Sequence, residues 1–156
     1  MLKSKGGAKP LVRNYTGNKF IVEEDFADRV GQSKDNLYVY FISLQQQADT
    51  YNISNNIFDV YELRFPASSM QISNFTFIGN TVKAKKVSGN LVIIKVSDSY
   101  DVDSIDISSN TIDLGSIADQ PFRLIMMINA NSAYAGSIKR ISVTNNKITL
   151  SPPGYN

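Results

Sequence analysis

Asparagine recurs in this 156-residue chain within one fixed frame of apolar neighbours. A large apolar residue lies three positions before each of these asparagines and another lies two positions after it, and most copies have a third four positions after it. The segments are YTGNKFIV, ISNNIFDV, FIGNTVKA, ISSNTIDL and VTNNKITL, around Asn18, Asn56, Asn80, Asn110 and Asn146. The frame is an internal repeat, and it constrains the fold before any composition argument is needed.

Each copy of the repeat predicts two β-strands that meet at a bend. Alternate residues of a strand face the same side, so Ile107 and Ile112 share an interior only if the chain bends around Asn110. Asparagine tolerates the left-handed backbone region, and we expect it to occupy this bend. Because side-chain amides both donate and accept hydrogen bonds, stacked copies would form an internal ladder.

The distances between successive copies predict a stacked array. The asparagines are separated by 38, 24, 30 and 36 residues, which is the range of solenoid repeats. A further apolar run in each interval is expected to be a third strand of a triangular coil. These runs are residues 37–44, 60–65, 91–96 and 122–128.

Over residues 11–150 the pattern apolar-x-apolar-x-x-Asn-x-apolar resembles the right-handed parallel β-helix family, the pectate-lyase-like solenoids. The resemblance implies an all-β fold: a right-handed, single-stranded parallel β-helix of about five coils with an internal asparagine ladder. We expect a flexible lead-in at residues 1–10 and one β-helix domain at 11–156. An antiparallel β-sandwich with asparagine-rich turns is the open alternative.

The composition excludes several kinds of chemistry. The chain has no cysteine and no histidine, so it has no disulfides, no thiolate or imidazole metal ligands, and no Ser-His or Cys-His nucleophile. A formal net charge of +2 without a clustered basic face argues against nucleic acid as a partner. No apolar run is long enough for a membrane span, and no signal-peptide core follows Met1. We expect a virion or extracellular location, reached within a particle, by lysis or as part of a longer protein.

Outward positions of the expected third strands supply the candidate ligand contacts. If Tyr61, Leu63 and Phe65 face inward, then Glu62 and Arg64 face outward. The same alternation places Val92, Ile94 and Val96 inward and, in the next run, Phe122, Leu124, Met126 and Ile128. Lys95 and Arg123 then face outward, and we expect one stripe of Glu62, Arg64, Lys95 and Arg123 that could meet an acidic sugar or an anionic partner.

Apolar residues are also expected on the outer surface. The outward set is Tyr38, Tyr40, Ile42, Ile93, Ile125 and Met127. Contiguous exposed apolar surface marks a contact, and the tyrosines favour sugar stacking while the isoleucines and methionine favour subunit packing. A register shift of one residue would instead turn Val39, Phe41, Ile94 and Met126 outward, because these runs are apolar on both faces.

Polysaccharide lyases of the resembled family use an arginine or lysine base and calcium held by aspartates. The nearest acidic run here is DSYDVDSID, with Asp98, Asp101, Asp103 and Asp106, and we interpret it as a polar loop. A calcium site in this loop is the less favoured interpretation, so we expect neither a metal nor another cofactor.

The resemblance extends to phage tailspikes, whose β-helices pack side by side in trimers. It implies a virion attachment module that binds a cell-surface glycan or packs in a multi-subunit appendage. Tyr38 and Tyr40 would stack on sugar rings, and the charged stripe would bind hydroxyl or acidic groups. The first alternative is a lyase or glycoside hydrolase of acidic polysaccharide, with Glu62, Lys95 and Arg123 as its catalytic candidates. The second is an architectural spacer, and we favour binding over catalysis.

Overall fold

The computed structural model describes residues 11–22, 38–40, 48–65, 72–89, 92–97, 101–117, 123–128 and 136–151. All the helices or strands assigned within these ranges are β-strands, so this part of the chain is all-β. The strands are β1 (Val12–Thr16), β2 (Lys19–Val22), β3 (Tyr38–Tyr40), β4 (Thr50–Ser54), β5 (Ile57–Phe65), β6 (Asn74–Ile78), β7 (Thr81–Gly89), β8 (Val92–Ser97), β9 (Ser104–Ser108), β10 (Thr111–Ile117), β11 (Arg123–Ile128), β12 (Ile141–Thr144) and β13 (Lys147–Ser151). The predicted lead-in at residues 1–10 lies outside the described residues.

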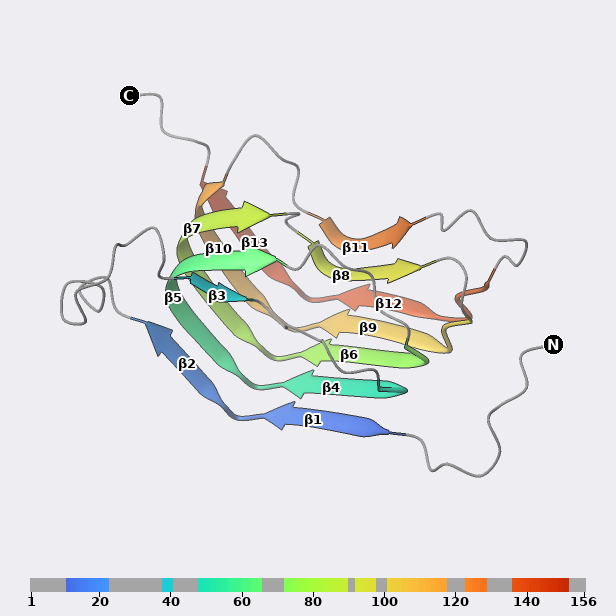
Figure 1. The fold of residues 1–156 in the computed structure, drawn as a ribbon. Helices are drawn as coiled ribbons and strands as arrows, with labels where there is room; N and C mark the ends of the chain where they lie inside the picture. The colour runs from blue at the N-terminus through green and yellow to red at the C-terminus, as the bar shows by residue number, and fades with distance from the viewer. Residues whose placement is uncertain are drawn as a thin grey trace.

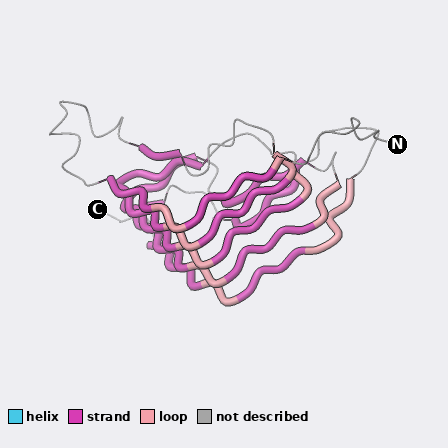
Figure 2. The backbone as a smooth tube through the Cα atoms, turned by 90° about the horizontal axis from the view of Figure 1, so that it is seen from below, coloured by secondary structure: helices cyan, strands magenta, loops and turns pink. Residues whose placement is uncertain are grey.

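Two parallel sheets form most of the structure. One sheet has the order β1-β4-β6-β9-β12, and the other has the order β2-β5-β7-β10-β13. Every strand of the first sheet leads directly into a strand of the second, so each such pair forms one rung of a stack (Figure 1). Seen along the stack, the rungs are nested V shapes whose vertices lie in one column (Figure 2). The parallel pairing excludes the antiparallel sandwich for the described residues.

The asparagine ladder lies at these vertices. Nδ2 of Asn56 donates to Oδ1 of Asn80 at 3.0 Å, and Nδ2 of Asn80 donates to Oδ1 of Asn110 at 3.1 Å. Asn18 and Asn146 extend the same chain of hydrogen bonds at either end. Asn56, Asn80 and Asn110 are each only 1% exposed, so the ladder satisfies polar groups that water does not reach.

The left-handed residue of each bend is not the ladder asparagine, as the sequence suggested, but the residue before it. Positive φ angles occur at Gly17, Asn55, Gly79, Ser109 and Asn145, between 54° and 69°. Glycine and asparagine are the residues that adopt this region at least cost, and they fill four of the positions. The ladder asparagine is therefore selected by its side-chain amide and not by its backbone angle.

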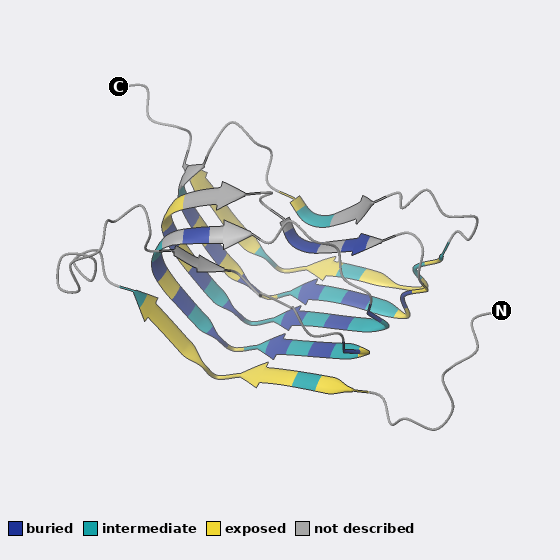
Figure 3. Ribbon diagram, in the orientation of Figure 1, coloured by how far each residue is buried: buried dark blue, intermediate teal, exposed yellow. Residues whose placement is uncertain are grey.

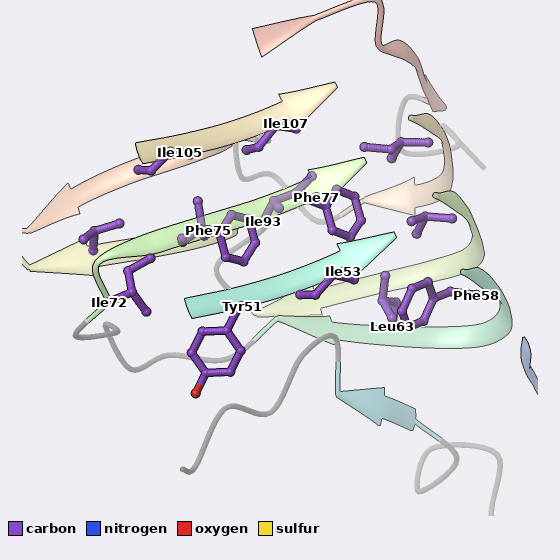
Figure 4. Packing of buried hydrophobic residues seen from close by; sticks show 14 of the residues in the cluster. Tyr51, Ile53, Phe58, Leu63, Ile72, Phe75, Phe77, Ile93, Ile105 and Ile107 are labelled. Atoms are coloured by element: carbon purple, nitrogen blue, oxygen red, sulfur yellow. The ribbon is translucent and has the colours of Figure 1, made fainter. Parts of the chain in front are cut away.

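The core lies between the two parallel sheets and β8, and it follows the predicted frame. Tyr51, Ile53, Phe75, Phe77 and Ile107 are at most 2% exposed, and Figure 4 shows their side chains on one side of β4, β6 and β9. Their outward neighbours along the same strands are half-buried, which gives the alternating bands in Figure 3. Burying each such side chain stabilises the fold by about 1.5 to 3 kcal/mol.

The third strands differ from expectation. Residues 60–65 do not form a separate strand but are the second half of β5, where Glu62 to Phe65 pair with Lys86 to Gly89 of β7. From the run 37–44 the structure describes β3, which also pairs with β5 and lies alongside that second half. Only the runs at 91–96 and 122–128 overlap strands of a separate sheet, the pair β8 and β11.

The inward alternation also changes phase within β5. Val60 is 3% exposed and Leu63 is 0% exposed, whereas Tyr61, expected to face inward, is half-buried. Two successive inward residues thus lie three positions apart, which marks a second bend in the sheet at Tyr61. The equivalent residues of β7 and β10 are Lys85 and Gly115. A Cβ atom on Gly115 would collide with the backbone carbonyl of Lys85, so the close approach of the two rungs requires glycine there.

One residue of the predicted outer apolar set is buried and another is half-buried. Ile93 is 4% exposed and Ile94 is 1% exposed, so β8 is buried on both faces at this point. Ile125 of β11 is half-buried and packs against the core. Ile93 therefore cannot form part of an external stripe, and Ile125 is covered in part by the core.

Candidate ligand-binding groove

A groove lies over β2, β5, β7 and β10 beside the second bend of the sheet. Its cavity volume is about 470 Å³. It is lined by residues of all four strands: Val22, Asp59, Val60, Tyr61, Lys83, Ala84, Lys85, Asp113 and Gly115. The groove runs along the stack from rung to rung, so successive rungs contribute equivalent positions to its wall.

A row of alternating charge forms one side of the groove. Asp59 of β5 is the register partner of Lys83 of β7, and Lys83 is the register partner of Asp113 of β10. All three residues are exposed. Neighbouring strands are about 4.8 Å apart, so the backbones of Asp59 and Asp113 are about 9.6 Å apart with Lys83 between them. The repeat creates this row, because each member lies three residues after a ladder asparagine.

The other side of the groove is formed two residues further along each strand. Tyr61 contributes an aromatic ring that is half-buried, and Lys85 contributes an exposed ammonium group. At the third rung Gly115 has no side chain, which leaves the groove open at that position. Val22, Val60 and Ala84 also border the groove, although Val60 and Ala84 are buried in the core.

The lining matches the chemistry of a polyhydroxylated ligand. Carboxylates accept hydrogen bonds from hydroxyl groups, ammonium groups donate to them, and an aromatic ring offers an apolar face to a sugar ring. The two aspartates and two lysines cancel in formal charge, so the groove as a whole does not select for anions. It is suited to a neutral or mixed-charge ligand more than to a strongly acidic one.

Four of the sequence-predicted contacts lie on β3 and β5 beyond the second bend. The register places Tyr38 beside Glu62 and Tyr40 beside Arg64. The four residues are thus neighbours in one sheet, one and three positions past Tyr61 on β5. Their role as ligand contacts stays a prediction.

Lys95 and Arg123 belong to the separate sheet. Lys95 of β8 is the register partner of Met126, and Arg123 of β11 is the register partner of Val92. The sheet order makes neither a register neighbour of Arg64, and the single charged stripe expected from the sequence stays a prediction. Arg123 is exposed. Met127 of β11 is the register partner of Val96 of β8. Ile42 falls outside the described residues.

Two of the aspartates considered for calcium, Asp101 and Asp103, have side-chain partners in the next rung. Oδ1 of Asp106 is buried and has no hydrogen-bond partner among the described residues. Oδ1 of Asp101 accepts hydrogen bonds from the backbone N–H and the hydroxyl of Ser137, both at 3.0 Å. Asp103 binds Nζ of Lys139 at 2.6 Å, and this hydrogen bond raises the pKa of the lysine. Asp106 lies on β9, and Asp98 is outside the described ranges. Asp101 and Asp103 therefore connect their loop to the next rung, and the described residues contain no acidic group arranged to hold a metal ion.

The charged row was missed although the sequence contained a signal for it. The third residue after each ladder asparagine alternates with two inward apolar residues and must face outward: Ile21, Asp59, Lys83, Asp113 and Thr149. The outward charges predicted from the sequence all lie in the runs expected as third strands, and the charged row precedes those runs. The second bend was not readable in the same way, because β5 offers apolar residues in both phases around Tyr61.

Comparison with protein-family models, curated protein sequences and solved structures found no match to this chain. The described residues also include no helical segment that could cross a lipid bilayer.

Proposed function

We propose that this chain is a glycan-binding module built on a right-handed parallel β-helix, of the kind used in virion attachment proteins. The parallel sheets and the buried asparagine ladder support the β-helix. The observation that supports glycan binding is the groove in which Asp59, Lys83 and Asp113 alternate in charge opposite Tyr61. In this proposal the protein acts outside a cell or on a virion and needs no cofactor.

The groove suggests how a sugar chain would bind. A ring lying on Tyr61 would direct its hydroxyl groups toward the charged row, where donors and acceptors alternate from strand to strand. Because the strands are stacked in register, a chain extended along the stack would meet a charged side chain at each of the three rungs that contain β5, β7 and β10. The hydrogen bonds to charged groups would supply specificity, and the ring contact would supply apolar burial.

Isothermal titration calorimetry with a panel of neutral, amino and acidic oligosaccharides tests this proposal. We expect neutral or amino sugars to bind, and we expect Lys83→Met to weaken binding about tenfold, because one charged hydrogen bond contributes about 1.5 to 3 kcal/mol. Arg140→Met is the matched control, since it removes one positive charge from an exposed residue that does not line the groove. Equal losses in the two variants, or no binding by any oligosaccharide, would contradict the proposal and favour a structural spacer.

Glycoside hydrolysis in the same groove is the second candidate. Inverting hydrolases hold their two carboxyl groups about 6.5 to 9.5 Å apart. Asp59 and Asp113 lie two strands apart, and their side chains can span that distance across Lys83. One carboxylic acid would protonate the leaving oxygen while the other carboxylate activates water.

Release of reducing ends from the bound oligosaccharide distinguishes catalysis from binding. If the groove is catalytic, Asp59→Asn and Asp113→Asn each reduce the turnover rate at least a hundredfold while the variants still bind the sugar. Glu62→Gln tests the earlier candidate on β5, and Lys95→Met and Arg123→Met test the proposed bases for elimination of an acidic polysaccharide. Full activity in all three of these variants would remove that second site from consideration.

A further inference from the structure

The first and last rungs of the described stack expose the side chains that other rungs bury. Val143 and Leu150 are 43% and 40% exposed, whereas Ile107 and Leu114, which hold the same positions of the repeat, are both 0% exposed. At the other end Phe20 is 40% exposed, against 6% for Phe58. The terminal strands β1, β2 and β12 are largely exposed in Figure 3. Each end therefore presents an apolar cross-section of the stack.

The ladder gives the two ends opposite hydrogen-bonding character. In every step, the backbone N–H and the side-chain Nδ2 of one asparagine donate to Oδ1 of the asparagine in the following rung. Within the described residues the ladder begins at Asn18 and ends at Asn146. The first rung therefore presents an acceptor, Oδ1 of Asn18, and the last rung presents a donor, the backbone N–H of Asn146.

The backbone around the bend follows the same polarity. The residue before each ladder asparagine donates its N–H to the following rung, as Ser109 does to the carbonyl of Thr144 at 3.0 Å. The residue after each asparagine donates to the preceding rung, as Lys147 does to the carbonyl of Asn110 at 2.8 Å. Asn145 at one end and Lys19 at the other are the corresponding donors on the two terminal rungs.

We propose that this chain stacks head to tail, with the β12–β13 rung of one copy resting on the β1–β2 rung of the next. Asn146 donates to Oδ1 of Asn18 in the next copy, which extends the ladder across the junction. In the repeat frame Val143 covers Tyr15, Ile148 covers Phe20 and Leu150 covers Val22. A second copy is the occupant because its first rung supplies both the apolar cross-section and the acceptors that the last rung needs.

The contact is heterologous, so it propagates. One surface of each copy binds a different surface of the next, and repetition without rotation to closure gives an open filament and not a closed dimer. Lys147 and Lys19 occupy the same position of the repeat and become neighbours across the junction. Both are exposed, so their repulsion is screened by salt, and assembly is expected to increase with ionic strength.

Sedimentation velocity of the full chain over a range of concentrations and salt tests the stacking. We expect the mean mass to rise steadily with concentration and with salt, without a plateau at a dimer or trimer. Val143→Lys blocks the last rung and Phe20→Lys blocks the first, and each alone is expected to weaken association about tenfold or more. Circular dichroism and thermal unfolding verify that the two variants fold, since both positions are already exposed.

Mixing the two variants decides the polarity of the contact. Each retains one intact surface, so head-to-tail stacking predicts that the mixture forms a one-to-one dimer and nothing larger. Association of either variant with itself as strong as wild type would overturn the proposal, because it would mean that like ends pair. Monomers at every concentration and salt in the wild type would overturn it as well. The experiment is independent of glycan binding, which uses the side of the stack.

Discussion

The ladder asparagines stabilise this fold as individual residues. Asn110 donates to the carbonyl of Phe77 at 2.8 Å and accepts from the backbone N–H of Asn80 at 2.8 Å. Both contacts are buried. Asn110→Ala leaves these groups without a partner, and we expect it to lower the free energy of unfolding by about 1 to 3 kcal/mol. Chemical denaturation measures the loss, and glycan binding in the folded variant should be unchanged.

Asn18→Ala is the matched control for the buried ladder. Asn18 is exposed and donates only to Asn56 among the described hydrogen bonds, so water can replace much of what it loses. We expect its cost to be clearly smaller than that of Asn110→Ala. Equal losses would mean that the ladder contributes through the backbone bend and not through buried amides.

Replacing the left-handed residue of a bend by glycine is expected to stabilise the fold, whereas replacing a ladder asparagine destabilises it. Ser109 has a φ of 56° where two of the other rungs have glycine. A residue with a Cβ atom is destabilised by about 1 to 2 kcal/mol in this backbone region. Glycine avoids this strain but loses more backbone entropy on folding, which offsets part of the gain. We expect Ser109→Gly to raise the free energy of unfolding by about 0.5 to 1 kcal/mol. A destabilised variant would show that the serine side chain has a role that outweighs the strain.

Tyr51 gives the core a dependence on alkaline pH. Its side chain is 2% exposed, and burial, followed by the charge of Tyr15, raises the pKa of its phenol. The folded state therefore holds the proton more tightly, so its contribution is complete below the ordinary pKa near 10 and is lost as pH rises through the folded pKa. Tyr51→Phe should reduce the stability difference between about pH 9 and about pH 11. An unchanged difference would assign the alkaline loss to other groups.

At the scale of the strands, the second bend of the sheet requires a glycine at position 115. Gly115→Ala would push a Cβ atom into the backbone of Lys85, and such overpacking typically costs about 1 to 3 kcal/mol. Because Gly115 also lines the groove, ligand affinity should fall together with stability. Gly17→Ala is the comparison, since a Cβ there meets nothing within 4 Å and the cost is only that of a φ of +69°. Unaltered glycan affinity in Gly115→Ala would show that the second bend does not shape the ligand-binding groove.

The strands flanking each bend could be read from the sequence because their alternation is unambiguous. Ile105, Ile107, Ile112 and Leu114 are all buried as the frame requires. The remaining strands were harder, because β5 and β8 are apolar in both phases. Alternation alone placed Tyr61 inward and Ile93 outward, whereas the bend at Tyr61 and the inner position of β8 depend on contacts between rungs.

The groove illustrates which part of a site sequence periodicity can find. Asp59, Lys83 and Asp113 share one position of the repeat, so their row follows once the bend and the parallel stacking are assumed. Tyr61 and Lys85 complete the groove only because the sheet changes phase beside them. The row was therefore within reach of the sequence, and the concave shape that makes it a site was not.

The interior and the ladder stabilise the fold, the side of the stack holds the groove, and the two ends expose complementary surfaces. This division predicts that variants in one region leave the others unaffected. Charged-row variants such as Lys83→Met should keep wild-type stability and stacking, unlike Gly115→Ala, and end variants should keep wild-type affinity for glycan.

Nuclear magnetic resonance titration of the labelled chain with the best oligosaccharide of the panel tests the proposed site most directly. We predict shift changes concentrated at the amides of residues 59–61, 83–85 and 113–115, with little change at Asn14, Asn52, Thr76 and Ser142 on the outer side of the first sheet. The end variant Val143→Lys keeps the sample monomeric during the titration. Shift changes on the first sheet or on the β8–β11 pair, with none at the groove, would contradict the account.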